Sequence, residues 1–204
     1  MAEGRWTYRD AGGIARTAVI LLYVDAALSA LAAGTALAIG PENFWGDGVG
    51  LFQLARFLIQ IATAIVVLIW LYRANANVRA LGADDMMGSP GLGVGWFFIP
   101  LANLFMPYMT VRDIWKASAK PKDWQAERAP AAILIWWLLW ITGGIIGVIV
   151  FRIEMEYGFK TAPPEALWLS LGSDLIWVAA SLLLAWIVRN VQAMQASAWP
   201  ASVY

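Results

Sequence analysis

Cysteine and histidine are both absent from this chain of 204 residues. Without cysteine, disulfides, thiolate metal sites and a cysteine nucleophile are excluded. Without histidine, the chain lacks the usual general base and the commonest protein ligand of transition metals. We therefore expect no metal, no cofactor and no catalytic residue of the common hydrolase or metalloenzyme kinds.

Charged residues are also scarce, since they make up 14% of the chain against about 25% in soluble proteins. The net charge is zero, so no overall field attracts nucleic acid. Hydrophobic residues instead make up 61% of the chain, and 13 residues are tryptophan, a side chain typical of membrane–water interfaces. This composition predicts an integral membrane protein.

Four apolar segments reach the length of about 20 residues that a membrane-spanning helix needs. The predicted spans are residues 14–39, 49–72, 131–151 and 166–188. The first contains Ala36-Leu37-Ala38, which resembles a signal-peptide cleavage site, but its apolar run far exceeds the usual length of about 7–15 residues. We interpret it as a retained span. The expected fold is an all-α, polytopic membrane helix bundle that forms a single domain over residues 1–204.

A fifth apolar segment, residues 91–108, is interrupted by Pro100 and Pro107, with Asn103 between them. Proline removes a backbone donor and crowds the preceding helical turn, and a freed carbonyl in hydrocarbon needs a partner inside the protein. We therefore predict a broken or re-entrant segment, followed by an interfacial helix over residues 109–118. In that helix Val111, Ile114 and Trp115 share one side, while Arg112, Asp113 and Lys116 can face water.

The distribution of basic residues favours a re-entrant segment, because positively charged loops stay on the cytoplasmic side. With four spans, both termini are cytoplasmic, and only Arg152 and Lys160 lie outside. Arg56 lies deep within a span, and the cytoplasmic side then holds the other eleven basic residues, namely Arg5, Arg9, Arg16, Arg73, Arg79, Arg112, Lys116, Lys120, Lys122, Arg128 and Arg189. The alternative is a fifth, complete span, which would move the C-terminus outside.

Polar residues inside the spans are the default functional candidates of a membrane protein. Arg56 and Asp174 lie at similar depths, roughly 10 and 12 Å from the outer ends of their spans at about 1.5 Å per residue, so we predict an ion pair between them. Asp25 lies deeper, and Gln60 and Asn103 are its expected partners. Together these five residues form a candidate polar membrane site, which serves either a proton or cation pathway or helix pairing.

Two glycine clusters have a packing interpretation. Gly91, Gly93 and Gly95 superficially resemble a phosphate loop, but no Lys-Ser/Thr follows and no strand precedes them. We interpret them as closely packed backbone. Gly143 and Gly147 have the small-xxx-small spacing that marks close helix–helix contacts in membranes.

The stretch from Trp70 to Ser118 resembles the family numbered 4328 among the domains of unknown function. The resemblance rests on Trp70-x-x-Arg73, Asn77, Leu81-Gly82, Ser89-Pro90-Gly91, Gly95-Trp96-Phe97-Phe98-Ile99-Pro100, Ala102-Asn103-Leu104, Pro107-Tyr108, Arg112-Asp113-Ile114-Trp115 and Ala117-Ser118. It implies a multi-pass protein of a bacterial cytoplasmic (inner) membrane, and it brings no activity, substrate or catalytic residue.

Three function classes are compatible with the sequence. The first is a non-catalytic scaffold that binds a homo-oligomeric or other membrane protein partner. The second is a small oligomeric channel or carrier that uses the broken segment and the buried Asp and Arg residues. The third is a binder or modifier of lipid headgroups, for which Arg73, Asn77, Arg112 and Asp113 form a candidate site at the cytoplasmic face. The expected partners are membrane lipids and no nucleic acid.

Overall fold

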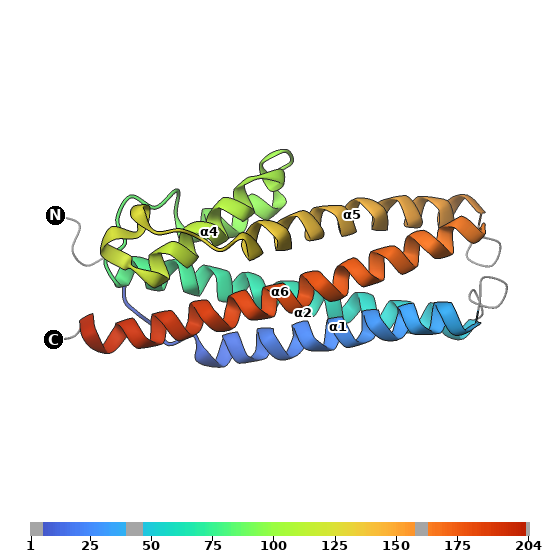
Figure 1. Ribbon diagram of the computed structural model, residues 1–204, viewed down its shortest axis with the longest axis horizontal. Helices are drawn as coiled ribbons and strands as arrows, with labels where there is room; N and C mark the ends of the chain where they lie inside the picture. Colours follow the sequence, from blue (N-terminus) through green and yellow to red (C-terminus); the bar gives the residue numbers. More distant parts are fainter. Residues whose placement is uncertain (1–5, 40–46, 158–162, 203–204) are drawn as a thin grey trace. The chain divides into compact units, whose positions relative to one another are not determined.

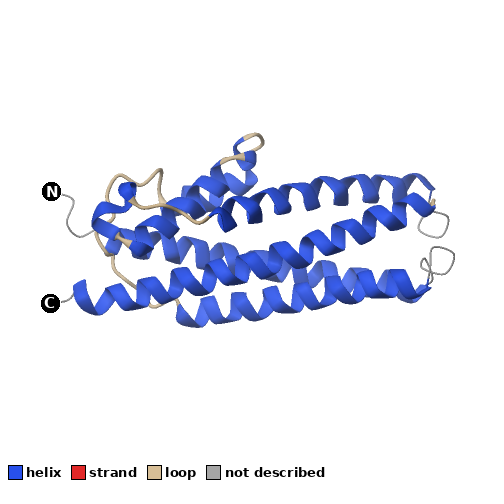
Figure 2. Ribbon diagram, viewed as in Figure 1, coloured by secondary structure: helices blue, strands red, loops and turns tan. Residues whose placement is uncertain are grey.

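The computed structural model describes residues 6–39, 47–157 and 163–202 (Figure 1). Within these ranges the chain forms helices, turns and loops, and no strand is present (Figure 2). The predicted all-α class is therefore confirmed. Arg5 and Lys160, which belong to the predicted charge distribution, lie outside the described residues.

Four helices in the described part of the chain are long and apolar enough to cross a membrane. They are α1 (Gly12–Ile39), α2 (Asp47–Ala80), α5 (Ala131–Tyr157) and α6 (Pro164–Ser202). These helices contain the four predicted spans, so the multi-pass membrane architecture is confirmed. The orientation of the chain in the membrane stays a prediction.

Two of these helices extend well beyond the predicted spans. The predicted spans end at residues 72 and 188, whereas α2 continues to Ala80 and α6 to Ser202. Each extension buries a helical face, which includes Ala74 and Val78 in α2 and Val191 and Gln195 in α6. The helices are longer than the predicted spans because buried polar side chains on these faces give the extensions a polar sequence.

The chain divides into two compact units, and the four long helices contribute segments to both. Unit 1 comprises residues 1–20, 64–134 and 184–204, and unit 2 comprises residues 21–63 and 135–183. The described helical segments of unit 2 therefore all belong to α1, α2, α5 and α6. Gly143 of α5 lies against Ile176 and Trp177 of α6, since a Cβ atom at Gly143 would lie 3.2 and 3.3 Å from these side chains. A Cβ atom at Gly147 would meet nothing within 4 Å, so only the first residue of the predicted small-xxx-small pair makes a close contact.

Unit 1 also contains the short helices between α2 and α5. They are α3 (Pro90–Gly95), α4 (Met106–Ala119) and the 3₁₀ helices η1 (Trp96–Phe98), η2 (Ala102–Leu104) and η3 (Pro121–Ala126). A Cβ atom at Gly93 would lie 3.0 Å from Asn75 Nδ2 and 3.1 Å from Thr110 Cγ2. The backbone of α3 therefore packs closely against α2 and α4, as the glycine cluster predicted.

The proline-containing segment is broken, as predicted. Helix α3 passes directly into η1, which ends at Phe98. The chain then turns at Leu101 before it enters η2 and α4. Pro107 lies in the first turn of α4, where its missing N–H group costs no helical hydrogen bond. Entry of this segment into the bilayer stays a prediction.

Candidate functional site

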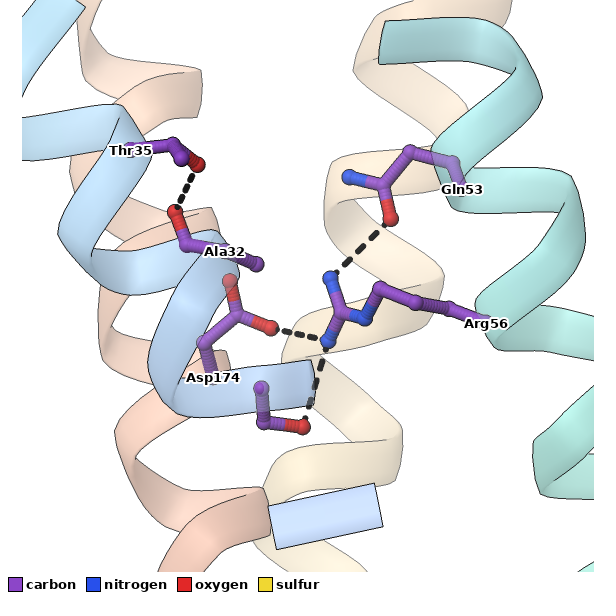
Figure 3. A network of polar contacts seen from close by, with 6 residues as sticks. Ala32, Thr35, Gln53, Arg56 and Asp174 are labelled. Atoms are coloured by element: carbon purple, nitrogen blue, oxygen red, sulfur yellow. Dashed lines mark hydrogen bonds and ion pairs between the residues drawn. The ribbon is translucent and has the colours of Figure 1, made fainter. Parts of the chain in front are cut away.

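The predicted ion pair between Arg56 and Asp174 is present in unit 2, with Arg56 Nη2 at 2.5 Å from Asp174 Oδ1 (Figure 3). Arg56 projects from α2 and Asp174 from α6. The guanidinium also donates to Gln53 Oε1 at 3.0 Å and to Ser29 Oγ of α1 at 3.2 Å. One arginine thus connects three helices through three hydrogen bonds inside the unit.

The burial of this ion pair indicates a structural role. The Asp174 side chain is 7% exposed and the Arg56 side chain 17%. A buried carboxylate is stable only when it is paired and hydrogen-bonded. Because each charge is neutralised by the other, the pair fixes the positions of α2 and α6 within unit 2, and it leaves no isolated charge for chemistry.

The other two candidates of unit 2, Asp25 and Gln60, are not brought together. The half-buried Asp25 carboxyl lies within hydrogen-bonding reach of the Thr63 hydroxyl and in the field of Arg56. Gln60 is exposed, although it lies only about 60° around the axis of α2 from the buried Thr63. No hydrogen bond joins Asp25 to Gln60 among the described residues, and the side chain near Asp25 is Thr63, whose hydroxyl donates to Ile59 O at 2.9 Å.

Unit 1 contains a second polar cluster, centred on Asn77 and Gln195. The Asn77 side chain accepts from Arg9 N at 3.0 Å and donates to Arg9 O at 2.9 Å. Gln195 is completely buried; its Nε2 donates to Ala74 O at 3.1 Å and to Ser118 Oγ at 3.0 Å. Its Oε1 accepts from Asn77 Nδ2 at 3.4 Å. These contacts join the N-terminal segment, α2, α4 and α6.

Arg79 supports this cluster from the end of α2. Its Nε donates to Asn75 Oδ1 at 3.1 Å and its Nη2 to Gly88 O at 2.5 Å. Its guanidinium also lies over the Trp6 ring, with Cζ 5.9 Å from the ring centroid, which is within the limit of about 6 Å for a cation–π contact. The chain from Met86 to Ser89 is thereby held against α2.

Several residues of this cluster were not predicted from the sequence, chiefly Arg9, Asn75, Ser118 and Gln195. Gln195 has a detectable signal, because Val188, Val191 and Gln195 recur at the spacing of one helical face. The backbone of Arg9 has none, since any residue supplies the same groups. Near Arg9, burial and the neighbouring Asp10 charge raise the pKa of Tyr8 above its usual value, so this side chain stays neutral at physiological pH.

The candidate headgroup residues have separate surroundings. Asn77 is buried in the cluster just described. Asp113 was expected to face water, but it is 5% exposed and pairs with Arg112, whose Nη2 lies 2.8 Å away. Asp113 turns inward because it shares the buried face of α4 with Thr110 and Ala117, which lie three and four residues away along the helix. Arg73 and Arg112 keep partly exposed side chains, so a headgroup site built on these four residues stays a prediction.

The polar candidate of the broken segment, Asn103, belongs to unit 1. Its Oδ1 atom is buried, and within the described residues it has no hydrogen-bond partner. The indole N–H of Trp96, on η1, has none there either. Within the same described ranges, no three acidic side chains form a group that could hold a metal ion.

Comparison with known proteins gives one match. A family model described as "Domain of unknown function (DUF4328)" matches residues 47–193. This range contains α2, α5, most of α6 and the broken segment. It also contains both polar clusters apart from Trp6, Arg9, Ser29 and Gln195. No curated protein and no solved structure matches the chain.

Proposed function

The chain belongs to the DUF4328 family, whose function is unknown, and we propose that it is a non-catalytic membrane protein that binds a partner within the bilayer. The polar side chains that could serve chemistry mostly support the fold instead: Arg56 pairs with Asp174, and Asn77 with Arg9. We propose the bacterial cytoplasmic membrane as its location, with both termini on the cytoplasmic side, where basic residues are concentrated.

The observation that carries this proposal is the exposed amide of Gln60. Gln60 lies roughly 20 Å along α2 from its first residue at about 1.5 Å per residue, which places it in the hydrocarbon core of a bilayer about 30 Å thick. Its side chain has no hydrogen-bond partner among the described residues and is exposed. An amide in hydrocarbon without a partner costs several kcal/mol, about 2–7 by transfer measurements. A partner outside the described chain removes that cost.

The partner that fits best is a second copy of the same chain. A carboxamide carries both donors and an acceptor, so two Gln60 side chains related by a two-fold axis satisfy each other. The surrounding surface of α2 is apolar, since Phe57 is 57% exposed and Ile61 42% exposed. Interhelical hydrogen bonds of this kind stabilise helix association in membranes by about 1–2 kcal/mol.

Disulfide cross-linking tests this pairing directly, because the natural chain has no cysteine. A Phe57→Cys reporter lies about 60° from Gln60 around α2, whereas Leu58→Cys lies about 160° away and serves as the matched control. Both side chains are equally exposed, at 57%. We expect oxidation in membranes to give a dimer with Phe57→Cys and little with Leu58→Cys.

The second step adds Gln60→Leu to the Phe57→Cys reporter. We expect this change to reduce the cross-linked dimer several-fold, since leucine keeps the apolar surface and removes only the amide. Equal cross-linking from Phe57→Cys and Leu58→Cys, or a dimer that survives Gln60→Leu undiminished, would contradict the proposal.

One observation favours transport as a second candidate function. Asp25 is half-buried beside Thr63 and in the field of Arg56, and a carboxyl group at this depth is suited to proton or cation movement. Proteoliposomes decide between the two functions. A non-catalytic binding protein gives the ion flux of protein-free liposomes, whereas a channel or carrier gives a larger flux that Asp25→Asn abolishes.

A further inference from the structure

The segment from the end of η1 to the residue after η2 presents three large apolar side chains at the surface of unit 1. Phe98 is 71% exposed, Leu101 79% and Phe105 65%. We call these three residues the apolar tip. Exposed apolar side chains that occur singly need no explanation, but a cluster at one turn marks contact with a membrane or a partner.

The backbone of this turn is suited to a medium without water. Four consecutive amide groups donate within the turn: Ala102 to Pro100 O at 2.8 Å, Asn103 to Ile99 O at 2.9 Å, and Leu104 and Phe105 to Leu101 O and Ala102 O at 3.1 Å. Pro100 has no N–H group to satisfy. Non-helical backbone is otherwise costly in hydrocarbon because its polar groups lack partners.

The conformation of Leu101 sets the direction of its side chain. Leu101 has φ 65° and ψ −47°, and the hydrogen bond from Ala102 N to Pro100 O closes a γ-turn around it. This hand of the γ-turn is rare and strained for a residue with a side chain. Leu101 is also the most exposed of the three tip residues. Its strained conformation therefore does not serve to bury the side chain in the protein.

The apolar tip lies at the opposite end of the α3–α4 hairpin from η3 and its lysine residues. Figure 1 shows the turn between η1 and η2 at one end of the α3–α4 hairpin, and η3 with the end of α6 at the other. The exposed side chains Lys120 and Lys122 lie next to or within η3, and basic residues of this kind favour the headgroup region. Helix α2 ends near the same side as η3, and its exposed Ile65 and Ile69 precede that end.

From these observations we infer that the apolar tip is inserted into the hydrocarbon of the bilayer, entering from the side of η3. The three side chains then face lipid acyl chains, and the amide groups of residues 102–105 are already paired within the turn. The α3–α4 hairpin is thus a lipid-binding, re-entrant element of the chain. This inference is independent of the proposed Gln60 pairing, because it uses other residues and another unit.

Spin-label accessibility tests the insertion in the full-length chain reconstituted in phosphatidylcholine–phosphatidylglycerol vesicles. Single labels are attached to Leu101→Cys and Phe105→Cys, with Ile69→Cys as the lipid-facing control and Ala126→Cys on η3 as the water-facing control. All four positions are exposed, so the substitutions disturb little packing. Oxygen, which concentrates in hydrocarbon, is compared with a water-soluble nickel chelate.

We expect the labels at Leu101 and Phe105 to behave like the label at Ile69, with strong oxygen broadening and loss of the nickel broadening seen at Ala126. Nickel broadening equal to that at Ala126 would overturn the inference, because the tip would then lie in water. Immobilised labels that exclude both reagents would overturn it as well, because a protein surface would then cover the tip.

Discussion

Asn77 and Arg9 exchange two hydrogen bonds, in which the amide side chain of Asn77 pairs with both backbone groups of Arg9. The two residues are 68 positions apart in the chain. The pair ties the segment before α1 to the end of α2, and the buried Gln195 extends it to α6. Unit 1 is therefore held together by side-chain amides as well as by apolar packing.

The first prediction concerns Asn77. In Asn77→Asp the carboxylate accepts from Arg9 N but donates to neither Arg9 O nor Gln195. A buried polar group without a partner costs about 1–3 kcal/mol, and we expect a loss of unfolding free energy of at least that size. Thermal unfolding in detergent micelles, followed by tryptophan fluorescence, measures it. Asn190→Ala is the control, because Asn190 bonds only to Trp186 O in an exposed position; an equal effect of both substitutions would contradict the prediction.

Gln195 gives a second prediction for the same unit. Gln195→Leu fits the buried space but leaves Ser118 and Asn77 each without one hydrogen-bond partner, and the expected loss is again about 1–3 kcal/mol. The exposed Ser197, two residues further along α6, provides Ser197→Ala as a control with an expected change within about 0.5 kcal/mol. If Gln195→Leu were as stable as the natural chain, the end of α6 would not be an integral part of unit 1.

The third prediction separates the loss of one charge from the loss of the pair in unit 2. Arg56→Met leaves Asp174 buried and unpaired, and breaking a buried pair in this way costs about 3–5 kcal/mol. The double variant Arg56→Met with Asp174→Leu removes both charges and is expected to recover most of the stability. Unfolding midpoints of the single and double variants test this; a double variant no more stable than Arg56→Met would show that the two side chains do not act as a pair.

Adjacent glycines of α5 allow a matched fourth comparison. Alanine is favoured over glycine in a helix by about 1 kcal/mol, and Gly144→Ala meets nothing within 4 Å, so it is expected to stabilise. Gly143→Ala places its methyl group 3.2 Å from Ile176, and overpacking costs about 1–3 kcal/mol. We therefore expect Gly143→Ala to be less stable than Gly144→Ala by about that amount in the same unfolding assay. The reverse order would show that α5 and α6 pack less closely than described.

The sequence predicted the features that follow from hydropathy, proline chemistry and depth. The four spans, the break near Pro100 and the pairing of Arg56 with Asp174 belong to this group, because each depends on position along one helix or on residue type alone. The partner of Asn77 could not be predicted, since backbone groups of a distant segment carry no sequence signal. The extension of α2 and α6 beyond the predicted spans could not be predicted either. Asn77 and Gln195 are buried there, although polar residues of these types usually lie at the surface.

The outward position of Gln60 is the part of the candidate site that sequence reading placed wrongly. Gln60, Arg56 and Thr63 lie within about 60° of one another around α2, so periodicity assigns all three to one face. Thr63 is buried and Gln60 is exposed because neighbouring helices cover one edge of that face and leave the other open. Only the packing of α1 against α2 distinguishes these edges, and that packing is a tertiary property.

Self-association through Gln60 is the central claim, and its dissociation constant in liposomes tests it most directly. Donor- and acceptor-labelled chains, labelled at Ala126→Cys, are diluted with lipid while energy transfer is recorded for the natural residue and for Gln60→Leu. The account predicts a dimer whose dissociation constant rises about tenfold in Gln60→Leu, equivalent to about 1.4 kcal/mol. Identical dissociation constants for the two chains, or no energy transfer above that of freely mixed monomers, would contradict it.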